Sequence, residues 1–236
     1  FGYLGQEGNI DNFNYDRYNV RTNIESDLAE NFRFTLGLSG VLSKRHTPGF
    51  NSGGTDANSY VGEAGWLSVA NQTIQMHPYL PETYNGMYTA SLKKNTSLPQ
   101  SPLAAIYESG YKKTRGLDVS ANISLSYDMP QIKGLQFKVS GAFDYGASMN
   151  KNLDTPYDIM GYSEGVWKEY ADPRGKGSGV MVGEGTSYYQ RLTGQASISY
   201  VNSFDLHNIE LLALGELIDY QSNNHSAYAK MLPFAN

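Results

Sequence analysis

The sequence has no cysteine and little charge, and each shortage excludes a class of protein. With 0 Cys in 236 residues, a disulfide-stapled secreted module, a thiolate metal site and a cysteine nucleophile are all excluded. Charged residues make up 17% and hydrophobic residues 40%, both below the usual share for a globular domain. The net charge of -5 and the absence of a basic run argue against nucleic-acid binding.

Long hydrophobic runs are also missing. The longest apolar stretch, around residues 209–217, is far shorter than the roughly 20 residues of a membrane-spanning helix. Phe1-Gly2-Tyr3-Leu4 has neither the basic region nor the cleavage site of a signal peptide. We therefore expect either a processed start or an internal piece of a longer protein.

Uncharged polar residues fill the gap, together with 25 Gly and 19 Tyr. A soluble domain normally stays in solution through charge, so a chain short of both charge and apolar core needs another explanation. A transmembrane β-barrel supplies one, because its polar faces line a watery lumen and its apolar faces meet lipid.

A period of two residues recurs along the chain, as expected of strands that are apolar on one side only. From residue 117 to 127 the odd positions are apolar and the even ones polar, and residues 135–147 and 188–200 repeat the pattern. Residues 18–28 and 32–39 alternate less cleanly. Residues 208–220 are apolar at both parities near Leu211 to Leu214, which leaves their facing open. The pattern predicts about six strands of roughly 10 to 15 residues, longer than the roughly 5 to 6 residues of ordinary strands.

The connections between these strands alternate in length. Short turns are predicted at 29–31, 128–134 and 202–207, and long excursions at 44–115 and 149–187. Short periplasmic turns on one rim and long extracellular loops on the other are typical of outer-membrane barrels. The fold predicted from the residues is all-β, a segment of an antiparallel transmembrane β-barrel spanning residues 1–236.

Three motifs in order along the chain resemble a known family. Residues 15–24 (YDRYNVRTNI) look like a recurrent "YxRYNxRxNI" strand. Residues 101–106 (SPLAAI) resemble an "NPLAAI" element, with Ser where Asn is usual. Residues 127–138 (YDMPQIKGLQFK) are similar to a "YDLPxIKGLxFK" hairpin. All three are features of the SusC/RagA-type TonB-dependent receptors of Bacteroidetes, so the sequence resembles a section of such a receptor.

The resemblance implies a larger barrel of about 22 strands, of which this chain would be a middle section without the plug domain. It also implies localisation in the cell outer membrane and TonB-driven import of an oligosaccharide or peptide. The implied partners are a SusD-like surface lipoprotein, the TonB complex reached through the missing plug region, and outer-membrane lipid. No cofactor is implied.

Aromatic residues in the long loops are the candidates for binding a ligand or a partner protein, because flat rings stack on sugars and anchor interfaces. They are Trp66, Tyr79, Tyr84, Tyr88, Tyr157, Tyr162 and Trp167. The alternative is that these rings only pack the loops on one another. A second aromatic set near strand ends predicts girdles at the lipid headgroups: Tyr127, Tyr145, Tyr188, Tyr200 and Tyr220.

Charged residues at one strand parity predict a lumen lining, or else an ordinary solvated face: Arg17, Arg21, Glu25, Asp27, Lys138 and Asp144. No catalytic constellation is visible, and the four histidines lack metal-ligand spacing. The resemblance implies a transporter, and these residues give no reason to predict an enzyme. Two alternatives stay open: a passive or structural outer-membrane barrel, and a soluble carbohydrate-binding or hydrolytic β protein. The sequence does not identify the ligand.

Overall fold

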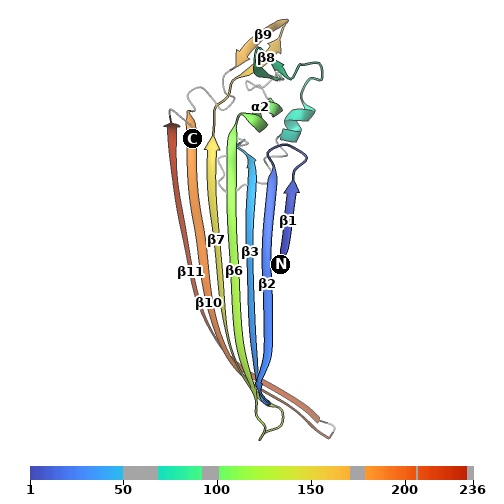
Figure 1. Cartoon of the computed structure of the whole chain (residues 1–236), viewed down its shortest axis with the longest axis vertical. Coiled ribbons are helices and arrows are strands. Elements are labelled where there is room, and N and C mark those ends of the chain that lie inside the picture. Colours follow the sequence, from blue (N-terminus) through green and yellow to red (C-terminus); the bar gives the residue numbers. More distant parts are fainter. Residues whose placement is uncertain (50–68, 92–100, 171–178, 206, 233–236) are drawn as a thin grey trace.

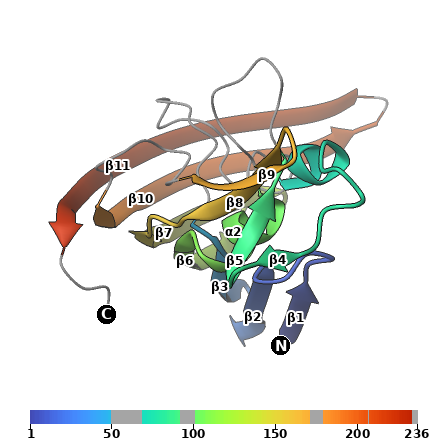
Figure 2. The same ribbon diagram turned by 90° about the horizontal axis from the view of Figure 1, so that it is seen from above.

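The computed structural model describes residues 1–49, 69–91, 101–170, 179–205 and 207–232. Within them, seven strands form one antiparallel sheet (Figure 1) in the order β1-β2-β3-β6-β7-β10-β11. Their bounds are β1 Gly2–Glu7, β2 Asn14–Ala29, β3 Phe32–Pro48, β6 Gly110–Asp128, β7 Leu135–Asp154, β10 Val180–Phe204 and β11 His207–Leu232. Seen from above, the sheet curves continuously from β1 to β11 without closing on itself (Figure 2).

The six predicted strands correspond to all strands of this sheet except β1. β1 is short, and its residues do not alternate between apolar and polar. A period of two therefore does not reveal it. It pairs with β2 through the connection at residues 8–13, which lies at the same edge as the long excursions. The turns β2–β3, β6–β7 and β10–β11 share the opposite edge, as predicted (Figure 1). The strands are long, as a barrel requires, but all six exceed the predicted length of roughly 10 to 15 residues, and β11 has 26.

The β6–β7 turn shows why the hairpin motif has its sequence. Gly134 has a φ of 89°, a left-handed conformation that side chains other than glycine rarely adopt. Its carbonyl accepts a hydrogen bond of 2.8 Å from the backbone N–H of Val201 in the neighbouring hairpin. A side chain at Gly134 would collide with the backbone of Val201. The glycine therefore both closes the turn and allows two hairpins to touch.

Register places the predicted apolar residues on one face of the sheet. Val119, Ile123 and Leu125 of β6 lie opposite Tyr145, Gly141 and Val139 of β7. Phe143, Val139 and Phe137 of β7 lie in turn opposite Leu192, Ala196 and Ile198 of β10. These side chains are substantially exposed, with Ile123 49% and Val139 62% accessible. In the described part of the chain no second sheet covers this apolar face, which argues against a soluble sandwich with a dry core.

Aromatic side chains border the apolar face at both ends. At the turn end, Phe32 stacks on Tyr127 with ring centroids 4.5 Å apart, and Phe137 lies opposite Tyr127. At the loop end, Tyr3 and Tyr18 lie 4.9 Å apart, and Tyr145 and Tyr188 lie 6.5 Å apart. The ten residue steps from Tyr127 to Leu117 rise ~23 Å at ~3.3 Å per residue and a ~45° tilt, close to the ~25 Å apolar band of outer-membrane barrels.

The prediction is wrong for one of the tyrosines assigned to these girdles. Tyr220 pairs with Arg191, so it lies on the polar face rather than with Tyr188. Leu212, Leu214 and Ile218 share that face, because their partners on β10 are Ser199, Ser197 and Thr193. The sequence of β11 is apolar at both parities, so only its register against β10 assigns the two faces.

The strands continue well into the ranges predicted as loops. β3 runs to Pro48 and β6 starts at Gly110, while β7 runs to Asp154 and β10 starts at Val180. The described part of the loops forms a second, smaller sheet at the top of the molecule in Figure 1, with the order β4-β5-β8-β9. These strands are β4 Thr83–Tyr84, β5 Met87–Ala90, β8 Ile159–Ser163 and β9 Val166–Tyr170.

Candidate functional site

The two long excursions meet in this small sheet. β5 comes from the first excursion and pairs in parallel with β8 from the second, through Thr89–Met160 and Ala90–Gly161. Helix α2, Pro102–Tyr107, packs beside them, and its buried residues include Ala104 and Ala105. We call β4, β5, β8, β9 and α2 the cap. It lies over the edge of the large sheet that carries the connections at 8–13 and the loops (Figure 1).

The second family-like motif, SPLAAI, builds α2. The side chain of Ser101 caps the helix by accepting a hydrogen bond of 3.4 Å from the backbone N–H of Ala104. Pro102 stands at the first helical turn, where its missing N–H costs nothing. Ala104 is fully buried against Ala90, Tyr157 and Ile159. The motif therefore supplies a helix start and the small side chains that let the two excursions pack.

The cap is also attached to the first hairpin of the large sheet. Asn12 donates a side-chain hydrogen bond of 3.2 Å to the carbonyl of Ile106. The hydroxyl of Tyr107 donates to the carboxylate of Asp11. This hydrogen bond raises the pKa of Tyr107, because losing the proton would place two negative charges side by side.

Three of the predicted loop aromatics come together at the tip of the cap. Tyr84 of β4 stacks on Trp167 of β9 with centroids 4.3 Å apart and planes 10° apart. Tyr162 of β8 lies 5.1 Å from the same indole at a tilt of 55°. Tyr84 and Tyr162 are exposed and Trp167 is half-buried. We call Tyr84, Tyr162 and Trp167 the aromatic tip.

The other candidates lie elsewhere. Tyr157 is buried in the core of the cap, and Tyr88 packs against that core and stacks on Tyr107 with centroids 6.0 Å apart. Tyr79 is 73% exposed and stacks on His77, with ring centroids 5.3 Å apart. Trp66 lies outside the described residues. Tyr88 and Tyr157 thus follow the alternative interpretation, in which loop aromatics pack the loops together.

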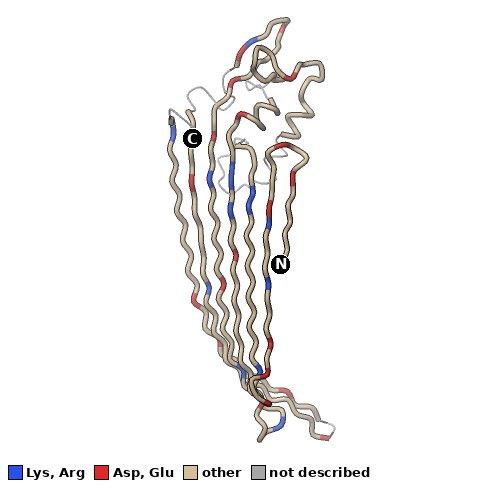
Figure 3. The backbone as a smooth tube through the Cα atoms, in the orientation of Figure 1, with Lys and Arg blue, Asp and Glu red and all other residues tan. Residues whose placement is uncertain are grey.

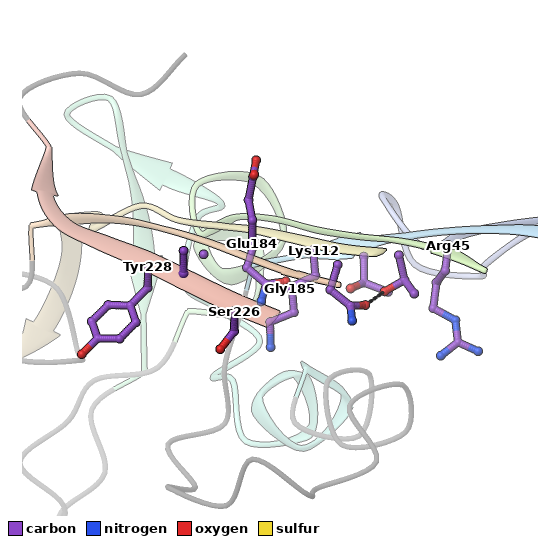
Figure 4. Close-up of a pocket in the computed structure, with 12 residues that line it drawn as sticks. Arg45, Lys112, Glu184, Gly185, Ser226 and Tyr228 are labelled. Carbon is purple, nitrogen blue, oxygen red and sulfur yellow. Dashed lines mark hydrogen bonds between the residues drawn. The ribbon is translucent and has the colours of Figure 1, made fainter. Parts of the chain in front are cut away.

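Beneath the cap, the polar face of the large sheet contains an open cavity of about 440 Å³, which we call the rim cavity. Figure 4 shows Arg45 and Tyr228 pointing to the cavity side of the sheet, whereas Glu184 points to the other side. Gly183 and Gly185 of β10 form part of the floor of the cavity, and a Cβ added to either would meet no atom closer than 3.7 Å, so a side chain could be accommodated there. The remaining lining is largely amide and hydroxyl: Thr47, Thr114, Asn150, Asn152 and Ser226.

Positive charge is placed at the rim cavity by Arg45 and Lys112. The Arg45 guanidinium lies 5.8 Å from the ring centroid of Tyr15. Thr114 donates a hydrogen bond of 2.8 Å to the side-chain oxygen of Asn150. Sequence reasoning missed this group because it assigned 44–115 and 149–187 to loops. The alternation that continues upward from Asp118 through Gly116 and Thr114 to Lys112 could have revealed it.

Below the rim cavity, polar and charged residues continue down the same face. Arg191 forms an ion pair with Asp144, with Nη2 and Oδ2 2.7 Å apart. Nearer the turn edge, Arg33 contacts both Glu25 at 3.4 Å and Asp27 at 3.2 Å. The charged residues predicted to share a face do share it in this register. Glycines on this face accept neighbouring side chains, as where the Tyr189 ring covers Gly146.

The described residues contain no cluster of three or more His, Cys, Asp or Glu side chains that could hold a metal ion. No helix in the described ranges is both long enough and apolar enough to cross a membrane.

The large sheet has one polar face and one apolar face that is bounded by two aromatic girdles. Short turns lie at one of its edges and long loops at the other. These features together define the class of outer-membrane β-barrels. No protein-family model matches the chain. The TonB-dependent receptor P3 of Formosa agariphila is 25% identical over 213 residues, which make up 89% of this chain and 18% of that receptor.

Solved structures agree on the fold. The RagAB peptide transporter superposes with a TM-score of 0.62 at 18% identity, over 93% of this chain and 22% of that one. The RagAB peptide importer in its open-open state gives a TM-score of 0.61 at 18% identity, over 92% and 21%. The chain thus spans about a fifth of these relatives. The resemblance to SusC/RagA-type TonB-dependent receptors is confirmed, and the fold of the chain is that of a segment of an outer-membrane β-barrel.

Proposed function

We propose that the whole protein imports a large nutrient, an oligosaccharide or a peptide, across the outer membrane as a TonB-dependent, SusC-like transporter. The observation that carries the proposal is the polar face of β2, β3, β6, β7 and β10, which runs from the rim cavity under the cap to the turn edge. A passive outer-membrane barrel would also need a polar lumen. It would not need loops that are joined into a cap over one end of that lumen. The likeness to a TonB-dependent receptor and to peptide transporters supports active uptake.

In this proposal the short turns are periplasmic, and the excursions at 44–115 and 149–187 are extracellular. The apolar face meets lipid and the polar face lines the lumen. The plug domain, which would contact the TonB complex, belongs to other parts of the protein. Transport then requires no covalent chemistry: the outer surface captures the ligand, and energised movement of the plug opens the lumen.

Within this segment, the aromatic tip is the proposed contact for a SusD-like surface lipoprotein or for the ligand. Its rings are already stacked, so little side-chain entropy is lost when a partner covers them. The rim cavity is the proposed first polar site inside the barrel. Its amide and hydroxyl side chains can donate and accept hydrogen bonds, as sugar hydroxyls and peptide groups both require.

The test uses cells that express the full receptor with its lipoprotein partner. Uptake of labelled oligosaccharide and peptide pools is measured with and without a protonophore, and in the variant Trp167→Ala. We expect uptake of one pool to require the receptor gene, to stop when the protonophore collapses the proton gradient, and to fall roughly tenfold in Trp167→Ala. Val166→Ala, an exposed neighbour on β9 outside the stack, is the matched control.

Uptake that continues after the proton gradient is collapsed would favour the alternative, a passive outer-membrane barrel. If uptake by Trp167→Ala equals that of the wild-type receptor, the aromatic tip is not the contact for the ligand or the lipoprotein. The proposed transport function would be unaffected. Co-purification of a lipoprotein with the wild-type receptor, but not with Trp167→Ala, would assign the tip to the partner rather than to the ligand.

A further inference from the structure

A group of basic side chains lies on the apolar side of the sheet, immediately beyond the aromatic girdle at the loop end. Figure 3 shows Lys and Arg gathered on the upper parts of β3, β6 and β7. Register assigns four of them to the same face as Leu117 and Tyr188, pointing away from the rim cavity. We call this group the outer basic patch, and it consists of Lys44, Lys113, Arg115 and Lys151.

The patch places like charges directly opposite each other. Lys44 of β3 pairs in register with Arg115 of β6, and two residues further on Lys113 of β6 pairs with Lys151 of β7. Like charges at directly opposed positions destabilise a sheet. His46 occupies the same row as Lys113 on β3. A sheet that keeps two such pairs side by side gains stability when an anion binds between them.

The acidic groups around the patch neutralise it only at its margins. Lys151 forms an ion pair of 3.2 Å with Glu184 on β10. Asp16 on β2 lies opposite Lys44, but it accepts a hydrogen bond of 2.8 Å from the hydroxyl of Tyr3. Within the described residues, no carboxylate lies within ion-pair distance of Lys44, Lys113 or Arg115. Lys44 and Lys113 instead sit over the rings of Tyr18 and Tyr111, at 5.7 Å and 4.1 Å.

The height of the patch matches lipid headgroups. Arg115 is two residues beyond Leu117 and Lys113 is four, which correspond to rises of ~5 Å and ~9 Å above the girdle row. Tyrosine girdles mark the level of the headgroups, so these cations reach the phosphate layer. At the opposite girdle, the described strand residues of β6, β7 and β10 on the same face include no Lys or Arg. The basic patch is thus confined to the loop end.

We propose that the outer basic patch binds the phosphate groups of a phosphorylated lipid headgroup in the leaflet at the loop end of the barrel. This inference rests on the proposed orientation, which makes that leaflet the extracellular one. Arg115 and Lys113 at the centre would contact phosphate oxygens, and Lys44 and Lys151 would close the two sides. Arg45 and Lys112 point to the opposite face, so a ligand in the rim cavity does not compete for the patch.

The experiment uses the full receptor, purified in a neutral detergent and titrated with bisphosphorylated lipid A or with the same lipid lacking its phosphates. Bound lipid is counted by native mass spectrometry. We expect the wild type to prefer the phosphorylated lipid and the preference to weaken as salt rises. The variant Lys44→Gln/Lys113→Gln/Arg115→Gln/Lys151→Gln should lose roughly 10- to 100-fold in affinity for it. Arg17→Gln/Arg21→Gln/Arg45→Gln/Lys112→Gln is the matched control, because it removes four charges from the opposite face.

Equal affinity for the two lipids, or an equal loss in the control variant, would overturn the proposal. If the fourfold variant fails to fold, Lys113→Gln and Arg115→Gln are tested singly. A wild-type preference for the phosphorylated lipid that does not weaken as salt rises would also contradict the proposal. Nutrient uptake separates this inference from the proposed function. Patch variants should keep uptake, whereas a failure of TonB-driven import would leave the lipid preference unchanged.

Discussion

Placing a charge at the middle of the apolar face should destabilise the barrel more than any other single change to that face. Ile123 lies four residues from Tyr127 in the girdle at the turn end and six from Leu117 in the girdle row at the loop end, so it is near the middle of the apolar face. Its side chain is 49% exposed and has Gly141 as its partner on β7, which leaves no group to shield an introduced cation. We expect Ile123→Arg to cost about 2 to 4 kcal/mol, the range for Arg at the midplane of an outer-membrane barrel.

This cost corresponds to a loss of roughly 30- to 900-fold in the folding equilibrium constant. Val139 lies one row from the girdle at the turn end, so Val139→Arg should cost less than Ile123→Arg. The matched control is Ser124→Arg, the next residue of β6, whose side chain points to the polar face in the row of Glu25 and Gln195. There the new charge stays in water, and the expected cost is about 1 kcal/mol or less.

The assay is urea-dependent folding of the full receptor into phosphatidylcholine vesicles, followed by the gel mobility difference between folded and heat-denatured barrels. We expect the order Ile123→Arg, then Val139→Arg, then Ser124→Arg, from most to least destabilised. Similar costs for Ile123→Arg and Ser124→Arg would show that the two faces meet the same solvent, and the assignment of lipid and lumen faces would be refuted.

Three further predictions address the polar face and the open edges of the sheet. Asp144→Asn breaks the ion pair with Arg191, and in a watery lumen it should cost about 1 kcal/mol or less in the same folding assay; a much larger cost would indicate a dry surrounding. Gly185→Leu should fill the floor of the rim cavity and reduce ligand uptake severalfold, whereas Gly194→Leu on the apolar face should not; equal uptake in both variants would remove the cavity from the transport path. Residues 1–236 expressed alone should not give a soluble monomer, because β1 and β11 are open edges and one face is apolar; a sharp monomer peak with a cooperative melt and no detergent would contradict this.

Much of the large sheet could be predicted from local pattern, because alternation along one strand depends only on residues next to one another. β6, β7 and β10 have a clean period of two, and their faces are as expected. β1 was missed because Tyr3, Gly5 and Glu7 on one face are no more apolar than Gly2, Leu4 and Gln6 on the other. The facing of β11 depends on which residue of β10 lies opposite Leu212, and sequence alone does not contain that pairing.

The candidate site was less predictable, because its contacts join residues far apart in the chain. Nothing local distinguishes Tyr84, which stacks on Trp167 at the tip, from Tyr157, which is buried in the cap. The parallel pairing of β5 with β8 decides both outcomes. Likewise, the outer basic patch appears only when register brings Lys113 beside Lys151 and Lys44 beside Arg115.

The central claim is that alternate residues of the large sheet face lipid and water, and cysteine scanning measures this most directly. The chain has 0 Cys, so single cysteines at consecutive positions from Leu117 to Tyr127 can each carry a fluorescent probe, with any cysteines elsewhere in the receptor replaced. In vesicles containing brominated lipid, quenching should alternate residue by residue, strong at Val119, Ala121, Ile123 and Leu125 and weak between them. A water-soluble quencher should give the inverse pattern. Uniform quenching, or lipid quenching that peaks at Ser120, Asn122 and Ser124, would contradict the account.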